Sequence, residues 1–169
     1  MAGATKTPAQ LEAERRAAAA AGASATQEQV NAVEAGFNAF AKANKKMEGA
    51  YAQLSGSLSP NERDNLNAYL LAIRTGEDQR PKYSSLAPAS DPKYAEVVAA
   101  ARENKEAKKQ FAGAREAMVA DENNTNSLIS QVEARSKQGQ ATTTSDVSIR
   151  DKDGETKPFS VILASQRGA

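Results

Sequence analysis

The sequence predicts a mainly α-helical fold. Its centre is a long antiparallel helical hairpin with coiled-coil-like packing, joined by a short third helix, an Ala-rich N-terminal helix and a C-terminal β-hairpin. Three observations carry this prediction: a seven-residue apolar repeat in the first half, legible helix start signals, and a period-two alternation after Gly139. The parts are an Ala-rich arm over 1–25, a helical bundle over 26–139, and a hairpin with a tail over 140–169.

Four helices are predicted from their boundaries. Thr7, Thr26 and Ser59 are each followed three residues later by Gln or Glu, which is the pattern of a capping box. Asp91-Pro92 supplies a fourth start, with Asp as the cap and proline in the first turn. Glycines at 22, 56, 76 and 139 stand where these helices should end. The predicted ranges are 8–21, 27–55, 60–75 and 92–138, with a long loop over 77–91.

The helix over 27–55 carries an apolar seam, in which residues three and four apart line one face. The seam positions are Val30, Val33, Phe37, Phe40, Asn44, Met47, Tyr51 and Leu54. At ~1.5 Å per residue this helix is about 45 Å long, and it cannot bury such a seam alone. We therefore expect a partner helix, supplied either by the same chain or by another subunit.

Asn44 is the polar member of the seam. A lone Asn in such a position can fix the helix register if it faces another polar group, at some cost in stability. The alternative, which the sequence alone favours slightly, places Asn44 at the edge of the apolar stripe.

The predicted helix over 92–138 is the in-chain candidate to cover the seam. Its apolar stripe lapses over 102–110, a charged stretch that we expect to be solvated. Asp, Asn, Thr and Ser over 121–127 compete with the helical backbone, which predicts a kink or a break with a fresh helix near 127–138. After a break, 92–121 would match 27–55 in length and pair with it as an antiparallel hairpin, and 60–75 would fold over one end.

The residues after Gly139 are predicted to form the β-hairpin. The apolar residues that alternate in its two runs are Val147, Ile149, Phe159, Val161 and Leu163. A two-residue Asp153-Gly154 turn would put the two runs on opposite faces, whereas a three-residue loop over 152–154 gathers all five residues on one face. We therefore predict the three-residue loop. Because an isolated hairpin is marginal in water, it must dock on the helices or extend a neighbouring subunit.

The composition argues against catalysis and against several ligand classes. His and Cys are both absent, which removes the commonest general base, the commonest metal ligand and the thiolate nucleophile. The acidic run over 151–155 lacks the spacing of a calcium loop and is better explained as a turn. With 22 basic and 21 acidic residues there is no electrostatic case for nucleic acid, and no apolar run reaches membrane-span length. We expect no catalytic residues, no metal and no cofactor.

These observations predict a non-enzymatic structural or assembly protein that acts through protein–protein contacts, as a homo-oligomer or as a subunit of a larger assembly. Its predicted contact surfaces are the seam of 27–55, the Ala-rich arm over 1–25 and the apolar face of the hairpin. Its general character favours a bacteriophage virion or scaffold component, and hence location in a virion. The alternatives are a secreted filament subunit or substrate of a bacterial secretion system, and a cytoplasmic chaperone or adaptor. Residues 15–25 imitate a signal peptide, but the preceding Glu12 and Glu14 favour an amphipathic arm.

Overall fold

The computed structural model describes residues 7–11, 25–76, 91–118 and 120–167. The fold is mainly helical with a small antiparallel hairpin near its end, as predicted. The elements are α2 (Gln27–Ser55), α3 (Pro60–Thr75), the 3-10 turn η2 (Pro92–Tyr94), α5 (Ala95–Ala117), α6 (Glu122–Lys137), β1 (Ser148–Arg150), β2 (Thr156–Pro158) and α7 (Phe159–Arg167).

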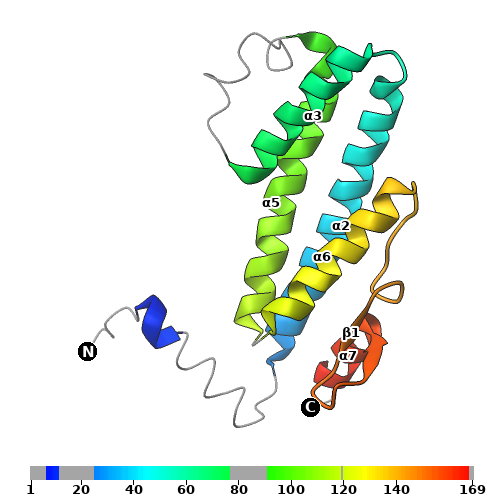
Figure 1. Ribbon diagram of the computed structural model, residues 1–169. Helices are drawn as coiled ribbons and strands as arrows, with labels where there is room; N and C mark the ends of the chain where they lie inside the picture. The colour runs from blue at the N-terminus through cyan, green and yellow to red at the C-terminus, as the bar shows by residue number, and fades with distance from the viewer. Residues whose placement is uncertain (1–6, 12–24, 77–90, 119, 168–169) are drawn as a thin grey trace.

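Helices α2 and α5 form the centre of the fold. They run antiparallel and side by side, and they share the most extensive contact between any two elements (Figure 1). Helix α3 lies on one half of this pair, whereas α6, the hairpin and α7 lie on the other half (Figure 1). Helices α3 and α6 therefore pack on different halves of the α2–α5 pair.

The predicted helix starts are confirmed where the structure describes them. Thr26 and Ser59 each form a complete capping box, and Asp91 caps η2. Residues 8–11 are helical, and the Thr7 side chain accepts from the Gln10 backbone N–H at 3.1 Å. The remainder of the predicted 8–21 helix, and residues 77–90 of the predicted loop, lie outside the described residues.

The seam of α2 is covered within the chain. Its residues from Val30 to Met47 are buried, and Tyr51 and Leu54 are partly buried. The ring of Phe111 on α5 packs against Phe37 edge-on, with centroids 5.7 Å apart, and stacks on Phe40 at 6.1 Å. The required partner helix is thus supplied by the same chain, and this part of the seam is core, not a surface for another subunit.

The buried apolar residues form two clusters, one at each half of the α2–α5 pair. The first cluster contains Val30, Val33, Phe37, Phe40, Ala41, Phe111, Met118, Leu128, Ile129, Val132, Val147, Ile149, Phe159 and Leu163. The second contains Met47, Ala50, Leu58, Leu66, Tyr69, Ile73, Tyr94, Val97, Val98, Ala100 and Ala101. The C-terminal hairpin and α7 therefore share a core with α2, α5 and α6.

The prediction that Asn44 lies at the edge of the stripe is wrong. Asn44 is 1% exposed and lies in the α2–α5 interface, where it faces Asn104. Asn104 belongs to the stretch 102–110 that we expected to be solvated, and it is buried as well. Although most of that stretch is charged, Asn104 lies on the face of α5 that packs against α2.

The predicted break before the last part of 92–138 is confirmed, but the new helix starts earlier than 127. Asp121 caps α6 by accepting from the Asn123 backbone N–H at 2.7 Å, so the helix begins at Glu122. The polar residues that were expected to disrupt the helix instead form its first turns. A strong N-cap outweighs their modest individual cost.

The hairpin turn is predicted correctly, but its second strand is not. Asp151 and Glu155 flank the three-residue loop, and Gly154 is left-handed with φ of 79°. The second strand ends at Pro158, and Phe159 begins helix α7. In this helix Phe159 and Leu163 lie on one buried face, whereas Val161 is 47% exposed. The predicted common strand face of five apolar residues is therefore wrong for Val161 and for the strand character of Phe159 and Leu163.

Side chains of α6 fasten the hairpin to the helices. The Gln131 amide accepts from the Ser148 backbone N–H at 2.9 Å and donates to the Ser148 carbonyl at 2.7 Å. Asn124 donates to the Arg150 carbonyl at 2.9 Å. These bonds satisfy the free edge of β1 as a neighbouring strand would. The hairpin thus docks on its own helices, one of the two arrangements that the sequence left open.

Candidate functional site

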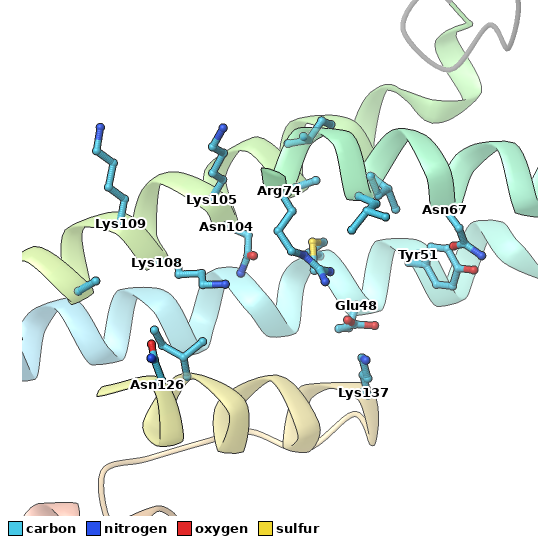
Figure 2. Close-up of a pocket in the computed structure, with 17 residues that line it drawn as sticks. Glu48, Tyr51, Asn67, Arg74, Asn104, Lys105, Lys108, Lys109, Asn126 and Lys137 are labelled. Carbon is cyan, nitrogen blue, oxygen red and sulfur yellow. The ribbon is translucent and has the colours of Figure 1, made fainter. Parts of the chain in front are cut away.

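A groove opens between α3 and α6 over the surface of the α2–α5 pair (Figure 2). Its volume is about 660 Å³, within the range of pockets that bind ligands. All four helices contribute to its lining, and we call it the α3–α6 groove. The lining residues are Met47, Glu48, Tyr51, Asn67, Leu70, Leu71, Ile73, Arg74, Ala101, Asn104, Lys105, Lys108, Lys109, Ala112, Asn126, Ile129 and Lys137.

The floor and one rim of the α3–α6 groove are apolar. Met47, Ile73 and Ile129 are buried beneath it and belong to the two core clusters. Leu71 lies on the α3 side and is 55% exposed, one of the few large apolar side chains open to solvent among the described residues. A partner that covers Leu71 and the floor would gain the free energy of apolar burial.

The polar part of the lining is strongly basic. Five basic side chains and one acidic side chain line the groove, a net charge of +4 in a chain whose total is +1. The basic residues are Arg74 on α3, Lys105, Lys108 and Lys109 on α5, and Lys137 on α6. The remainder of the chain is accordingly net acidic, so positive potential is concentrated at this site.

Glu48 is the acidic residue of the lining, and it lies between two cations. Arg74 and Lys137 extend toward it from opposite walls (Figure 2). Burial raises the pKa of the Glu48 carboxyl above its usual value, and the positive charges of Lys137 and Arg74 counteract only part of that effect. The groove thus holds a partly desolvated carboxylate beneath an excess of positive charge.

The dipole of their own helix explains the position of some of the basic residues in the groove but not of others. Arg74 and Lys137 lie in the last turns of α3 and α6, where the helix dipole favours positive charge. Lys105, Lys108 and Lys109 lie in the middle of α5, where that effect does not apply. Lys108 pairs with Glu133 at 3.9 Å, and because both side chains are partly exposed to solvent this pair contributes little. The dipole of the helix that carries each residue therefore accounts for two of the five cations, and the Lys105 ammonium lies beside Gly76, at the C-terminal end of α3.

The acidic run at the hairpin tip is a structural turn. The Asp151 carboxylate accepts from the backbone N–H groups of Asp153 and Glu155, both at 2.9 Å, and pairs with Lys157 at 2.7 Å. The hydrogen bond from Lys157 is the main cause that lowers the pKa of Asp151. Within the described part of the chain, no group of three or more acidic residues lies close enough to hold a metal ion.

The site differs from the surfaces that the sequence suggested. Met47 and Tyr51 of the predicted seam line the groove, whereas Val30, Val33, Phe37 and Phe40 lie in the core and Leu54 packs against it. Of the predicted hairpin face, only Val161 is exposed. The sequence predicted that Lys105, Lys108 and Lys109 lie on an ordinary solvated helix face. Their position within 102–110, where the apolar stripe lapses, is the sequence feature that could have indicated a basic surface there.

Comparison with known proteins adds no assignment. None of the helices in the described ranges has the length and apolarity needed to cross a membrane. No protein-family model, no curated protein and no solved structure matches this chain.

Proposed function

We propose that this chain is a non-enzymatic assembly protein that holds a partner protein in the α3–α6 groove. The observation that carries the proposal is the combination of an apolar floor, the exposed Leu71 and a local net charge of +4 in one groove. Apolar contact at the centre with charged groups at the rim is the general pattern of a protein-binding surface.

The arrangement of the fold supports this proposal. The long α2–α5 pair gives the groove a rigid base, because its own seam is filled by Phe111 and its neighbours from the same chain. We also propose that α2 and α5 pack as an antiparallel coiled coil, as the three-and-four spacing of the seam indicates. A rigid base with a preformed groove lowers the ordering cost of binding.

Membership of a bacteriophage virion or scaffold stays a prediction from the general character of the sequence. Co-purification of the chain with capsid or tail proteins would support it. Recovery from the culture medium without lysis would favour the secreted alternative instead.

The proposal is tested by site-specific photocrosslinking in the cells that make the protein. A photoreactive amino acid replaces Leu71, which is 55% exposed at the groove. The matched control carries it at Val161, which is 47% exposed on α7 and does not line the groove. We expect irradiation to give a discrete protein adduct from position 71 and none of the same mass from position 161. Absence of any adduct at 71, or the same adduct from both positions, would overturn the proposal.

A further inference from the structure

We infer that the α3–α6 groove receives an acidic amphipathic α-helix of the partner protein. This inference rests on the proposed function and adds the chemistry of the docked element. It is carried by the length of the groove, the distribution of its charges and the apolar surface between them.

The length of the groove suits a helix. Its lining residues on α5 run from Ala101 to Ala112, which spans about 17 Å at ~1.5 Å per residue. That distance equals roughly three turns of a docked helix. The walls are themselves helices, α3 and α6, which already lie on the α2–α5 pair (Figure 1). A guest helix would thus pack on the same pair in the same manner.

The distribution of the cations favours a helix over a small anion with one charged group. Arg74 extends into the groove from the α3 wall, and Lys137 from the α6 wall (Figure 2). Lys108 extends from α5 toward α2, whereas Lys105 and Lys109 extend from α5 away from α2 (Figure 2). A ligand with a single anionic head needs cations clustered at one end. A helix with acidic residues on both flanks of its apolar stripe needs cations on opposite walls, as Arg74 and Lys137 are here.

The apolar surface defines what the centre of the guest helix must contain. Leu70 and Leu71 on α3, Ile129 on α6 and Met47 on α2 bring apolar side chains to the groove from three sides. A stripe of apolar residues at positions i, i+3, i+4 and i+7 would fill such a groove. The guest therefore combines a leucine-like stripe with Glu or Asp on both sides of it.

The test selects ligands from a displayed library of random peptides of roughly 15 residues, about four helical turns. The full chain is the target, and the double variant Arg74→Glu/Lys137→Glu is selected in parallel. We expect the wild-type protein to enrich peptides with an apolar stripe of helical period and an excess of Glu and Asp. The variant should not enrich these peptides.

Synthetic copies of the enriched peptides then give the size of the effect by fluorescence anisotropy. The Arg74→Glu/Lys137→Glu variant should weaken binding roughly tenfold or more, because two attractive charges become repulsive. The control Lys42→Glu/Lys152→Glu makes the same change in net charge at two exposed lysines outside the groove. It should change the affinity by less than about threefold, as expected for distant screened charges. Circular dichroism establishes that both variants keep the helical fold.

A second variant covers the possibility that the charge reversal disturbs folding. Leu71→Asp replaces an exposed side chain and should weaken binding by a similar factor, whereas Val161→Asp should not. Enrichment of peptides without acidic bias, or equal binding by wild-type and groove variants, would overturn the inference. Binding of dodecanoate to the groove with no acidic peptide enriched would overturn it in favour of a small amphiphile. If the photocrosslink at position 71 still forms in those cases, the proposed function stands and only the acidic helix is rejected.

Discussion

Asn104 donates a 3.0 Å hydrogen bond from its Nδ2 to the Oδ1 of Asn44, across the contact between α5 and α2. The two residues are 8% and 1% exposed. They lie between the two apolar clusters that fill the halves of the α2–α5 pair. Because a shift of either helix would break this bond and bury two unpaired amides, the pair favours a single register.

Replacing one member of the Asn44–Asn104 pair should destabilise the protein more than replacing both. Asn104→Leu leaves the buried Asn44 amide without its donor and should lower the free energy of unfolding by about 1–3 kcal/mol. In Asn44→Leu/Asn104→Leu both polar groups are replaced by apolar side chains, so most of that loss should be recovered. Equilibrium urea denaturation measures both effects. If the double variant loses as much stability as Asn44→Leu and Asn104→Leu lose together when each is made alone, this interpretation is wrong.

Two glycines of α2 should respond oppositely to alanine. A Cβ at Gly36 would lie 3.2 Å from the Phe111 Cα, a backbone atom that cannot rotate away, whereas a Cβ at Gly49 meets nothing within 4 Å. Gly49→Ala should stabilise by about 0.5–1 kcal/mol through helix propensity. Gly36→Ala should instead destabilise by about 1 kcal/mol, because it separates α2 from α5. Thermal unfolding distinguishes the two, and a stabilised Gly36→Ala would show that the helices do not approach as described.

Arg115 joins α5 to α6 and α7 from a buried position. Its Nε donates to Thr125 Oγ1 at 3.1 Å, and its guanidinium lies 5.5 Å from the centre of the Phe159 ring. Burial lowers the pKa of Arg115 to about 10. Thr125→Val should cost about 1.5–3 kcal/mol, because a buried charged donor loses its acceptor.

The same Thr125→Val substitution should cost less than about 1 kcal/mol when Arg115 has first been replaced by Met, since no buried charge is then left unpaired. A double-mutant cycle in urea gives the difference. Equal costs in the two backgrounds would mean that the hydrogen bond contributes nothing to stability.

The side chain of Gln131 should protect the backbone amide of Ser148, in the hairpin, from hydrogen exchange. Gln131→Ala removes both hydrogen bonds to Ser148, so the Ser148 amide should exchange with solvent much faster. The stability of the whole chain should fall by about 1–3 kcal/mol, because the amide of a half-buried strand edge loses its partner. Hydrogen exchange monitored by NMR provides the measurement. The matched control is Gln110→Ala, whose side chain donates to the exposed Glu106 on the same helix, and this change should leave Ser148 unchanged.

Glu48 should make the stability of the fold depend on pH. Its pKa is raised mainly by burial, with Glu133 adding to the shift and Lys137 and Arg74 opposing it. The folded state therefore binds a proton more tightly than the unfolded state. Its contribution to stability is present at low pH and is lost as pH rises from about the unfolded value of 4.5 through the folded pKa.

Glu48→Gln removes this titration. The variant should gain stability relative to wild type as pH rises through that window, and the difference should level off above it. Urea denaturation at pH values from about 4 to about 8 makes the comparison. A difference that does not change with pH would mean that folding does not raise the pKa of Glu48.

The sequence predicts those features that depend on local interactions. Capping boxes at Thr26 and Ser59 involve residues three apart, and the seam is defined by residues three and four apart. The loop over 152–154 follows from requiring the second apolar run, over 159–163, to share a face with Val147 and Ile149. The position of Asn104 opposite Asn44 does not follow, because it depends on how far α5 is displaced along α2.

The wrong prediction of a strand over 159–163 arises because the apolar residues there fit both the period of a strand and the period of a helix. Phe159, Val161 and Leu163 suit a strand, but Phe159, Ile162 and Leu163 suit a helix equally well over so short a run. The groove could not be predicted for a different reason. It exists because α3 and α6 cover different halves of the α2–α5 pair, and no single segment encodes that relationship.

The last helix has a consequence for how the protein is made. Gln166 accepts from the Ala25 backbone N–H at 3.2 Å, and Arg167 reaches Glu34 at 3.0 Å, so the last turn of α7 closes over the start of α2. During synthesis the cluster around Leu66 and Tyr94 has all its members once α5 has emerged from the ribosome. The cluster around Phe37 must wait for Phe159 and Leu163. The surface of Phe37 that Phe159 covers therefore stays exposed until α7 has been synthesised, after the other cluster is complete, and exposed apolar surface in that interval favours aggregation.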